Sequence, residues 1–292
     1  MVRVCCPHRR GRGDHSAGLR RGIGRGEGLS NSAGAPLWTE VGTGVYKRRY
    51  RRLDQNIVAI VGGGSVLVVD SRATHPDADE LRSDLAALTS SPVDWLVNTH
   101  FHWDHTFGNS RFPESTIVGH TRCRSELIAH GEEVKVELTT EDWIPVEERH
   151  LFLEVAITPP VVTFGEKMDI YLGDRRVSLW HPGLGHTNSD IVVMVDDVCV
   201  AGDLVEQGAP PSFGDSHPKA WVRTLEVLAS AVDGPVIPGH GDVVDAEFVR
   251  SQRDELTAAI GFLEGGGEGL PPFPESVMAT IGERLTHEAT PR

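Results

Sequence analysis

Apolar runs in the first half of the chain predict strands that pair in a sheet. Residues 55–61 and 65–70 are rich in β-branched side chains and are separated by Gly62–Gly64, a pattern typical of a hairpin. Residues 93–98 form a short apolar run that predicts a buried strand, and residues 116–118 form a shorter one.

Helical periodicity lies between and after these runs. Pro76 opens a helical pattern that ends near Ser90, and its apolar positions recur on one face at Leu81, Leu85 and Leu88. Residues 122–130 predict a second helix. Residues 132–160 contain many acids and several prolines, so we expect an irregular excursion there.

The second half repeats this order of elements. Short apolar runs predict strands over residues 161–164, 168–172, 177–180, 191–195, 198–201 and 236–237. Pro218 opens a helix with Trp221, Leu225 and Leu228 on one face, and residues 245–263 predict another. Each half therefore contains strands, helix, strand and helix, which fits a two-sheet sandwich with helices outside.

The two ends of the chain differ from the body. Residues 1–36 contain seven arginines, eight glycines and two acids and lack apolar periodicity, so we expect a disordered basic tail. Residues 37–264 are expected to form one folded domain. Residues 265–292 begin with three glycines and then place Val277, Ile281 and Leu285 four residues apart, which predicts a Gly/Pro linker and a short C-terminal helix or tail.

Charge narrows the classes of function. The chain has 292 residues, of which 39% are hydrophobic and 24% charged, enough apolar material for a sizeable core. Its formal net charge is −14, and the basic tail leaves the body more acidic still. Nucleic-acid binding without sequence preference depends on Lys and Arg that neutralise phosphates, so we expect no nucleic-acid partner.

The same patterns bear on location. No apolar run approaches the roughly 18 residues of a membrane helix, so we expect no membrane association. Two Arg-Arg pairs near the start are not followed by the apolar stretch that an export signal needs, which makes the cytoplasm the expected location. Four cysteines are too few for a disulfide framework in a chain of this length.

The segment with the strongest chemical signal is residues 98–105, Asn-Thr-His-Phe-His-Trp-Asp-His, which directly follow a predicted strand. It supplies three imidazoles and a carboxylate within six positions, namely His100, His102, Asp104 and His105. Imidazole and carboxylate are ligands that zinc prefers in proteins. The spacing predicts a metal site, against the alternative of a polar surface loop with crowded histidines.

Three single residues further along each follow apolar sequence. His186 lies in Gly-His-Thr-Asn-Ser-Asp, Asp203 ends Val-Cys-Val-Ala-Gly-Asp, and His240 lies in Pro-Gly-His-Gly. The flanking glycines allow a sharp turn and a close backbone approach. Each residue alone is a weak signal, because a lone histidine is more often structural than a ligand. Together, and in this order, they indicate one site.

In these motifs the sequence resembles the metallo-β-lactamase superfamily over about residues 40–250. Asp70 matches the first of that family's five motifs, residues 100–105 match the second, and His186, Asp203 and His240 match the third, fourth and fifth. The resemblance implies an α/β fold, the four-layer αββα sandwich, over the catalytic domain of residues 37–264. It also implies two zinc ions at the loop edge of the sandwich.

The resemblance assigns a role to each of these side chains. It implies that one zinc is bound by His100, His102 and His186, that the other is bound by Asp104, His105 and His240, and that Asp203 bridges both. Asp70 is expected to brace the ligand loop as a carboxylate of the second shell.

Other residues near the motifs have two interpretations. Asp190 belongs either to the second shell or to a hydrogen bond that closes the loop after His186. Trp103 either lines the substrate cleft or packs in the core. Residues 206–217 follow the bridging Asp203 and read as a loop that rims the site and sets specificity.

The implied reaction is hydrolysis by metal-bound hydroxide. Two divalent cations exceed the charge of two aspartates, and this excess lowers the pKa of a shared water to near 7. We expect the hydroxide to attack an ester, thioester, lactone or amide carbonyl of a small molecule, while Asp104 orients the nucleophile and assists proton transfer. Asp203, where resistance-type β-lactamases usually carry Cys or Ser, makes β-lactam hydrolysis less favoured.

Two further classes stay open. Persulfide dioxygenases share the motif order but bind one Fe²⁺ through residues that correspond to His100, His186 and Asp203, a facial triad suited to oxygen chemistry. A third hypothesis is that the protein is a metal-binding scaffold without catalysis. The sequence does not determine the oligomeric state, although homodimers are common in folds of this kind.

Overall fold

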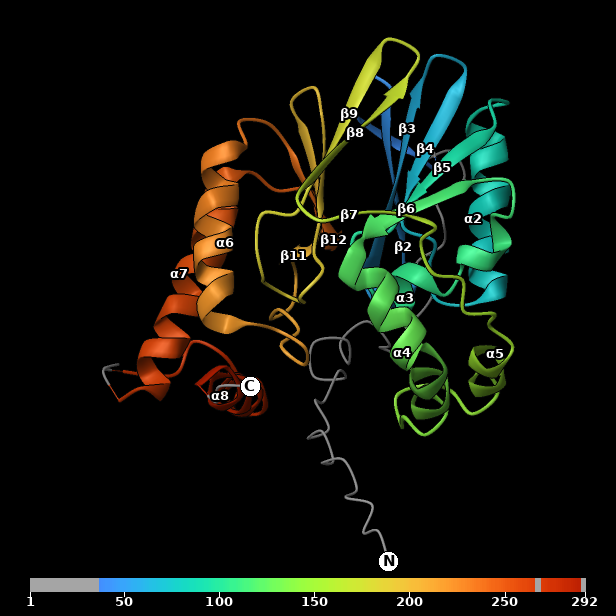
Figure 1. Ribbon diagram of the computed structural model, residues 1–292. Helices are drawn as coiled ribbons and strands as arrows, with labels where there is room; N and C mark the ends of the chain where they lie inside the picture. The colour runs from blue at the N-terminus through green and yellow to red at the C-terminus, as the bar shows by residue number, and fades with distance from the viewer. Residues whose placement is uncertain (1–36, 266–268, 290–292) are drawn as a thin grey trace, which may run out of the picture.

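The computed structural model describes residues 37–265 and 269–289, so the predicted tail over residues 1–36 lies outside the described residues. Within these ranges twelve strands are joined by hydrogen bonds. Ten of them follow the order β7-β6-β5-β4-β3-β12-β11-β10-β9-β8, and β2 pairs with β3 and β1 with β2 beside this path. The path folds into two leaves that face each other, and helices cover the outer side of each leaf (Figure 1). The four-layer αββα sandwich, an α/β fold, is therefore confirmed.

The first leaf comes from the first part of the chain. Its strands are β1 (Thr39–Gly42), β2 (Val45–Tyr50), β3 (Gln55–Gly62), β4 (Ser65–Val69), β5 (Val93–Val97), β6 (Thr116–His120) and β7 (Val162–Phe164). The predicted hairpin of β3 and β4 is confirmed and turns at Gly63 and Gly64, whose φ angles of 56° and 79° favour glycine. The strands β4 to β7 are parallel, so their carboxyl ends meet at one edge.

The second leaf contains β8 (Lys167–Leu172), β9 (Arg175–Trp180), β10 (Val192–Val195), β11 (Val198–Glu206) and β12 (Val236–His240). Strands β8 to β11 are antiparallel, whereas β11 and β12 are parallel. The pairing of His240 with Gln55 connects β12 to β3 and so joins the two leaves.

The helices form the two outer layers. The first leaf is accompanied by α2 (His75–Leu88), α3 (Trp103–Thr106), α4 (Thr121–Leu138) and α5 (Arg149–Leu153), with short 3-10 helices at Arg52–Asp54 and Asn109–Arg111. The second leaf is covered by α6 (Pro218–Ala231), α7 (Ala246–Leu263) and α8 (Glu275–Ala289). Thr74 and Asp245 cap α2 and α7 by accepting hydrogen bonds from backbone N–H groups in the first turn.

Buried side chains separate the layers. Between the leaves, Val58 and Leu67 of the first leaf belong to the same core as Leu179 and Val193 of the second. A second core lies between the second leaf and α6, α7 and α8, and a third between the first leaf and α2. The apolar faces predicted for α2 and α6 are the faces that these cores bury, and α7 buries Val249, Leu256 and Ile260.

Two stretches differ from the sequence prediction. Residues 132–160 are not wholly irregular, because α4 continues to Leu138 and α5 follows. Gly131 and Lys135 occupy two of the buried positions of α4, so its apolar period is interrupted in the sequence. Strand β2 was not predicted, because three consecutive basic residues, at positions 47–49, mask its alternation.

The C-terminal helix α8 buries Val277, Met278 and Ile281 against α6 and α7. It lies beyond the Gly/Pro stretch, of which residues 266–268 fall outside the described ranges. Among the helices that the structure describes, none has the length and apolar character needed to cross a bilayer.

Candidate metal centre

All seven predicted ligands meet at the loop edge of the sandwich. His100, His102, Asp104 and His105 lie directly after β5, at the start of and within α3. Asp203 lies near the end of β11 and His240 is the last residue of β12, while His186 lies in the loop between β9 and β10. Residues more than 130 positions apart in the sequence thus face one another.

The first group of ligands consists of His100, His102, His186 and Asp203, whose donor atoms all lie within 4.8 Å of one another. Nε2 of His186 is 2.9 Å from Nδ1 of His102. Oδ2 of Asp203 is 3.6 Å from Nε2 of His186 and 3.7 Å from Nε2 of His100.

The second group consists of Asp104, His105 and His240. Oδ2 of Asp104 is 3.3 Å from Nε2 of both histidines. Asp203 also reaches this group, since its Oδ1 is 3.3 Å from Nε2 of His105 and its Oδ2 is 3.4 Å from Nε2 of His240. The Asp203 carboxylate therefore stands between the two groups.

Acceptors outside the centre fix the orientation of three histidines. Nδ1 of His105 donates to Oδ2 of Asp70 at 2.8 Å. Nδ1 of His186 donates to the carbonyl oxygen of Ser212 at 3.1 Å, and Nδ1 of His240 donates to that of Leu53 at 2.7 Å. Because a carbonyl oxygen can only accept, the hydrogen of each of these rings is on Nδ1 and the lone pair of Nε2 faces inward.

The remaining two histidines, His100 and His102, are oriented by outer partners in the same way. The Thr99 hydroxyl donates to Oδ2 of Asp70 at 2.8 Å, so it accepts from Nδ1 of His100, 3.0 Å away. Nε2 of His102 donates to Oδ2 of Asp215 at 3.2 Å, which leaves Nδ1 of His102 as the inward nitrogen. All five imidazoles thus point one nitrogen into the centre, and in the neutral ring that nitrogen carries the lone pair.

This arrangement fits a divalent cation. Nε2 of His100, Nε2 of His105 and Oδ1 of Asp203 are buried and have no hydrogen-bond partner among the described residues. Unsatisfied buried polar atoms are costly, and a cation shared by several lone pairs removes that cost. Five imidazole nitrogens and two carboxylates form a donor set that suits zinc or a similar borderline metal.

The charges of the second group and of Asp203 are strongly coupled. Burial raises the pKa of Asp104, but the attraction of His105 and His240, whose Nε2 atoms lie 3.3 Å from Oδ2 of Asp104, outweighs it and holds that pKa well below its usual range. The Asp203 carboxyl behaves in the same way. Burial lowers the pKa of His105 and His240, but the facing carboxylates raise both well above the usual range, so without a metal each ring holds a second proton, which a bound cation would displace from Nε2. Both carboxylates are therefore anionic at neutral pH, the state that a cation requires.

The histidines of the first group differ from one another. Burial lowers the pKa of His186 to about 3 and lowers that of His100 well below its usual range, so both rings are neutral. For His102 burial acts in the same direction, but the hydrogen bond and charge of Asp215 raise its pKa overall.

Asp70 braces the ligand loop. Its carboxylate accepts hydrogen bonds from N–H and Oγ1 of Thr99 and from Nδ1 of His105, and the residue is buried with a φ angle of 67°.

The bridging Asp203 needs a glycine beside it, because a Cβ atom at Gly239 would collide with Oδ1 of Asp203. The backbone of β12 can therefore pass close behind that carboxylate.

Asp190 and Trp103 are the two residues for which the sequence left two interpretations. The Asp190 carboxylate accepts from N–H and Oγ1 of Thr187, both at 2.7 Å, so it closes the loop that carries His186. Trp103 lines the cleft above the centre, but most of its ring is buried against Trp143 and Phe152.

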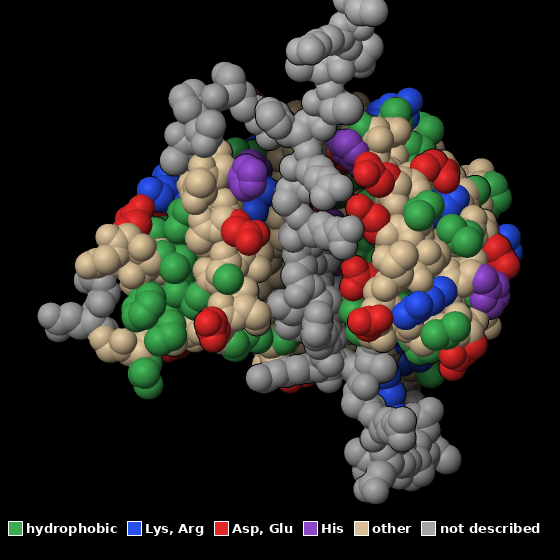
Figure 2. Space-filling view, turned by 90° about the horizontal axis from the view of Figure 1, so that it is seen from below, with side chains coloured by type: hydrophobic (Ala, Val, Ile, Leu, Met, Phe, Trp, Pro, Cys, Tyr) green, Lys and Arg blue, Asp and Glu red, His purple; other side chains and the backbone are tan. Residues whose placement is uncertain are grey.

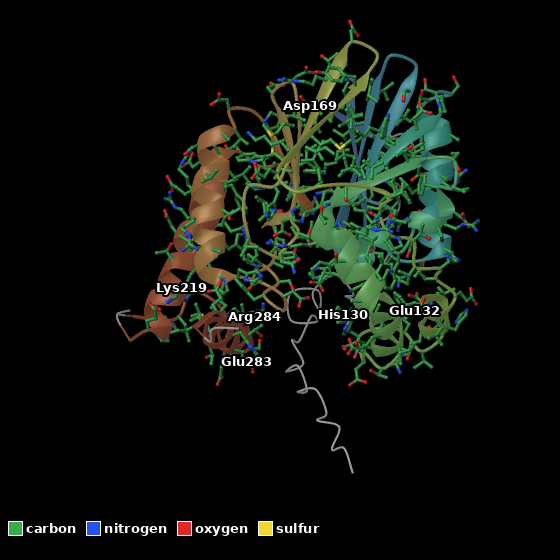
Figure 3. All side chains as sticks on the ribbon, viewed as in Figure 1. His130, Glu132, Asp169, Lys219, Glu283 and Arg284 are labelled. Atoms are coloured by element: carbon green, nitrogen blue, oxygen red, sulfur yellow. The ribbon has the colours of Figure 1, made fainter. Side chains whose placement is uncertain are left out.

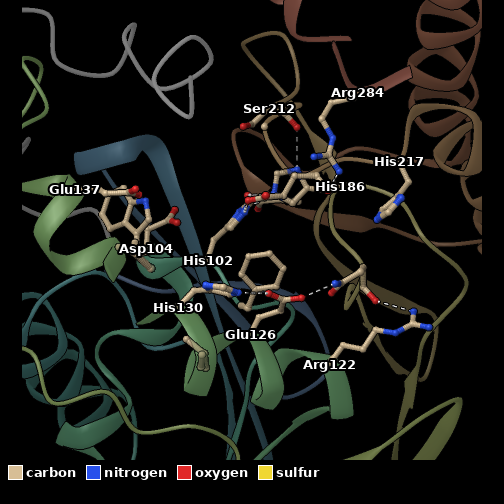
Figure 4. Close-up of a pocket in the computed structure, with 18 of the residues that line it drawn as sticks. His102, Asp104, Arg122, Glu126, His130, Glu137, His186, Ser212, His217 and Arg284 are labelled. Carbon is tan, nitrogen blue, oxygen red and sulfur yellow. Dashed lines mark hydrogen bonds and ion pairs between the residues drawn. The ribbon is translucent and has the colours of Figure 1, made fainter. Parts of the chain in front are cut away.

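A cleft of about 1800 Å³ opens over the metal centre (Figure 4). One wall is α4, with acidic side chains that include Glu126, Glu133 and Glu137, and Figure 2 shows Asp and Glu side chains along this side of the molecule. The other wall is formed by residues 206–217 and by α6 and α8, and it carries Arg223 and Arg284. The two walls therefore differ in charge, and residues 206–217 do rim the site.

Sequence reasoning missed the outer partners of three histidines. The carbonyl oxygens of Leu53 and Ser212 have no signal in a sequence, because every residue has one. Asp215 lies within the loop that was expected to rim the site, but nothing in its neighbours pointed to His102.

The fold and the convergent donors define an αββα protein with two candidate metal sites. Residues 50–240 match the family model of the metallo-beta-lactamase superfamily, and the chain belongs to that superfamily. Metallo-beta-lactamase type 2 of Bacillus cereus is 23% identical over 198 residues, which cover 65% of this chain and 68% of the relative.

Solved structures share the fold. The metallo-beta-lactamase from Pontibacter korlensis aligns with a TM-score of 0.59 at 18% sequence identity, over 75% of this chain and 98% of that structure. The metallo-beta-lactamase FIM-1 from Pseudomonas aeruginosa, solved in its mono-zinc form, aligns with a TM-score of 0.59 at 17% identity, over 76% of this chain and 95% of its own.

Proposed function

We propose that this protein is a dinuclear zinc-dependent hydrolase that cleaves an ester, thioester, lactone or amide bond in a small molecule. The observation that carries the proposal is the completeness of both ligand groups. His100, His102 and His186 would hold one metal, Asp104, His105 and His240 the other, and Asp203 reaches both groups. The inward lone pairs of all five imidazoles support this assignment.

The chain's own residues prepare the site for hydrolysis. A bound divalent metal supplies Lewis acidity, which acidifies water and polarises a carbonyl oxygen. The buried Asp104 carboxylate lines the cleft and is anionic, so it would accept a hydrogen bond that orients the attacking water and would assist its proton transfer. The outer acceptors hold the imidazoles in place, so no ligand has to reorient when substrate enters.

The cleft supports a small polar substrate. Its volume of about 1800 Å³ is more than the roughly 300–1,000 Å³ that most ligand pockets offer a small molecule, so a small substrate fits, and the charged side chains on both walls favour a polar one. The acidic body makes nucleic acid an unfavourable partner. The relatives named above are β-lactamases, but Asp203, where resistance-type β-lactamases usually carry Cys or Ser, leaves β-lactams as one class among several acyl substrates to be screened.

Metal content tests the proposal. The protein is purified without added metal or chelator, its metals are measured by elemental analysis, and it is then screened with thioesters, lactones and a chromogenic β-lactam. We expect about two zinc ions per chain and hydrolysis of at least one acyl class. One iron per chain with oxygen consumption on a persulfide would instead establish the dioxygenase alternative at His100, His186 and Asp203. Metal-loaded protein that turns over no substrate of either kind would overturn catalysis altogether.

Substitution of the carboxylates is the matching prediction. We expect Asp104→Ala and Asp203→Ala each to lower kcat/KM for the substrate found by the screen at least about 100-fold, because each removes a ligand and an anionic group from the reacting centre. The exposed Asp169, which hydrogen-bonds Ser178 on β9, provides the control Asp169→Ala. Near wild-type turnover in either of the first two variants would contradict the assigned roles.

A further inference from the structure

The loop between β11 and α6 touches two metal-ligand histidines from outside the centre. Within this loop, the carbonyl oxygen of Ser212 accepts from Nδ1 of His186 (Figure 4). Oδ2 of Asp215, three residues further on, accepts from Nε2 of His102. Both contacts bear on the same ligand group, because His102 and His186 face each other across 2.9 Å. The position of this loop therefore sets the orientation of two imidazoles.

Asp215 has a specific consequence for His102. His102 presents Nδ1 to the centre, whereas the other four histidines present Nε2. A neutral imidazole carries one N–H, so Nδ1 is available as a ligand only if the hydrogen is on Nε2. The Asp215 carboxylate, 3.2 Å from Nε2, stabilises that tautomer.

The C-terminal helix α8 holds the loop that carries Asp215. Arg284 donates from Nε to the carbonyl oxygen of Ser216 at 2.8 Å and from Nη2 to that of Asp215 at 3.2 Å. Figure 3 shows Arg284 on the side of α8 that faces these loops and Glu283 on the side that faces away. The planar guanidinium contacts two successive carbonyls with two donors, a geometry that a lysine cannot reproduce.

Two further contacts fix the same loop to the C-terminal segment. Phe213 packs against Phe273, which precedes α8, and against Trp221 of α6, with ring centroids 5.8 Å and 5.3 Å apart. Nδ1 of His217, at the end of the loop, lies 3.9 Å from Oε1 of Glu288 on α8. Residues 275–289 lie outside the part of the chain that matches the family model, yet they fix a loop of the metal centre.

We propose that α8 is a working part of the metal centre: Arg284 positions the loop that carries Asp215, and Asp215 positions His102 for the metal bound by the first ligand group. The inference rests on the metal site of the proposed function, but not on the reaction or the substrate. Asp215 and Arg284 act through His102 and are positioning residues.

Zinc affinity tests this coupling. Each protein is stripped of metal and titrated with zinc against a chromogenic chelator, and its thermal unfolding is recorded without metal. We expect Asp215→Ala to weaken one of the two zinc equivalents about 10–100-fold and Arg284→Ala to weaken the same equivalent by about tenfold, with the other equivalent unchanged. Glu283→Ala, on the other side of the same helix, is the matched control and should change neither.

Two comparisons separate positioning from a general loss of structure. Asp215→Asn keeps an acceptor for Nε2 of His102, so it should recover most of the affinity that Asp215→Ala loses. The double variant Asp215→Ala/Arg284→Ala should bind zinc no more weakly than Asp215→Ala alone, because Arg284 acts through Asp215.

The coupling is refuted if Arg284→Ala binds both equivalents as the wild type does, or weakens both in parallel with a fall in the melting temperature of the metal-free protein. Failure of the proposed function has a different signature. Wild-type protein that binds two zinc ions and hydrolyses no acyl substrate would refute the hydrolase while the effect of Arg284 on zinc affinity still stood.

Discussion

At the scale of single residues, the centre depends on acceptors that bind no metal. Five buried or nearly buried imidazoles each need one nitrogen protonated and the other free, and a different group meets that need for each ring. Asp70 contributes most, because it accepts directly from His105 and indirectly, through the Thr99 hydroxyl, orients His100. The Asp70 carboxylate thus orients one histidine of each ligand group.

We expect Asp70→Asn to lower the free energy of unfolding of the metal-free protein by about 2 kcal/mol. Asparagine tolerates the positive φ of this position, but its amide group places a donor where the carboxylate accepts from Thr99 or His105. Urea unfolding in the presence of a chelator measures the change. The exposed Asp169→Asn should stay within about 0.5 kcal/mol of the wild type, and equal stabilities of the Asp70 and Asp169 variants would contradict the role given to Asp70.

At the scale of elements, most helices and strands could be predicted because their apolar period is uninterrupted. The prediction failed where a charged or glycine residue takes a buried position, as Gly131 and Lys135 do in α4. The ligands share a strong signal, several His and Asp at fixed spacing after strands. Asp215 and Arg284 lack one, because their role follows from a tertiary contact 69 positions apart in the sequence.

A histidine at the N-terminus of α4 stacks on a second histidine. His120 caps α4 by accepting from N–H of Arg122, donates from Nε2 to the carbonyl oxygen of Gly165, and stacks on His181 with ring centroids 4.3 Å apart. Burial, and after it the neighbouring His181, lowers the pKa of His120 to about 4, against an ordinary value of 6.5.

The unfolded chain therefore binds more protons than the folded chain between these two values. The stability that neutral His120 contributes is fully present above about pH 6.5 and is lost as the pH falls towards about 4. We expect His120→Asn, which keeps a capping acceptor, to reduce this acid destabilisation by about 1–2 kcal/mol, allowing for solvent screening. Urea unfolding of metal-free wild type and variant from pH 7 to pH 4 measures the difference, and parallel pH curves would contradict the prediction.

At the scale of the whole molecule, the centre joins the two leaves of the sandwich. His100, His102, Asp104 and His105 come from the first leaf, whereas His186, Asp203 and His240 come from the second. Each ligand group takes members from both leaves. The leaves are joined by the shared core, by the pairing of β12 with β3 and by hydrogen bonds such as that from N–H of Ile191 to the carbonyl oxygen of Thr99, and a bound metal would add a further connection at the loop edge.

Removal of metal should therefore lower the melting temperature of the whole sandwich. A ligand present at about 1,000 times its Kd stabilises the folded state by about 4 kcal/mol, which corresponds to roughly 10 °C for a domain of this size. We expect a chelator to lower the melting temperature of zinc-loaded wild type by about that amount and zinc to restore it. Asp203→Asn, which weakens the group shared by both sites, should reduce the shift by more than half, while Asp169→Asn should keep it. An unchanged melting temperature in wild type after complete removal of zinc would show that metal does not connect the leaves, because a metal bound to both must stabilise the fold that brings its ligands together.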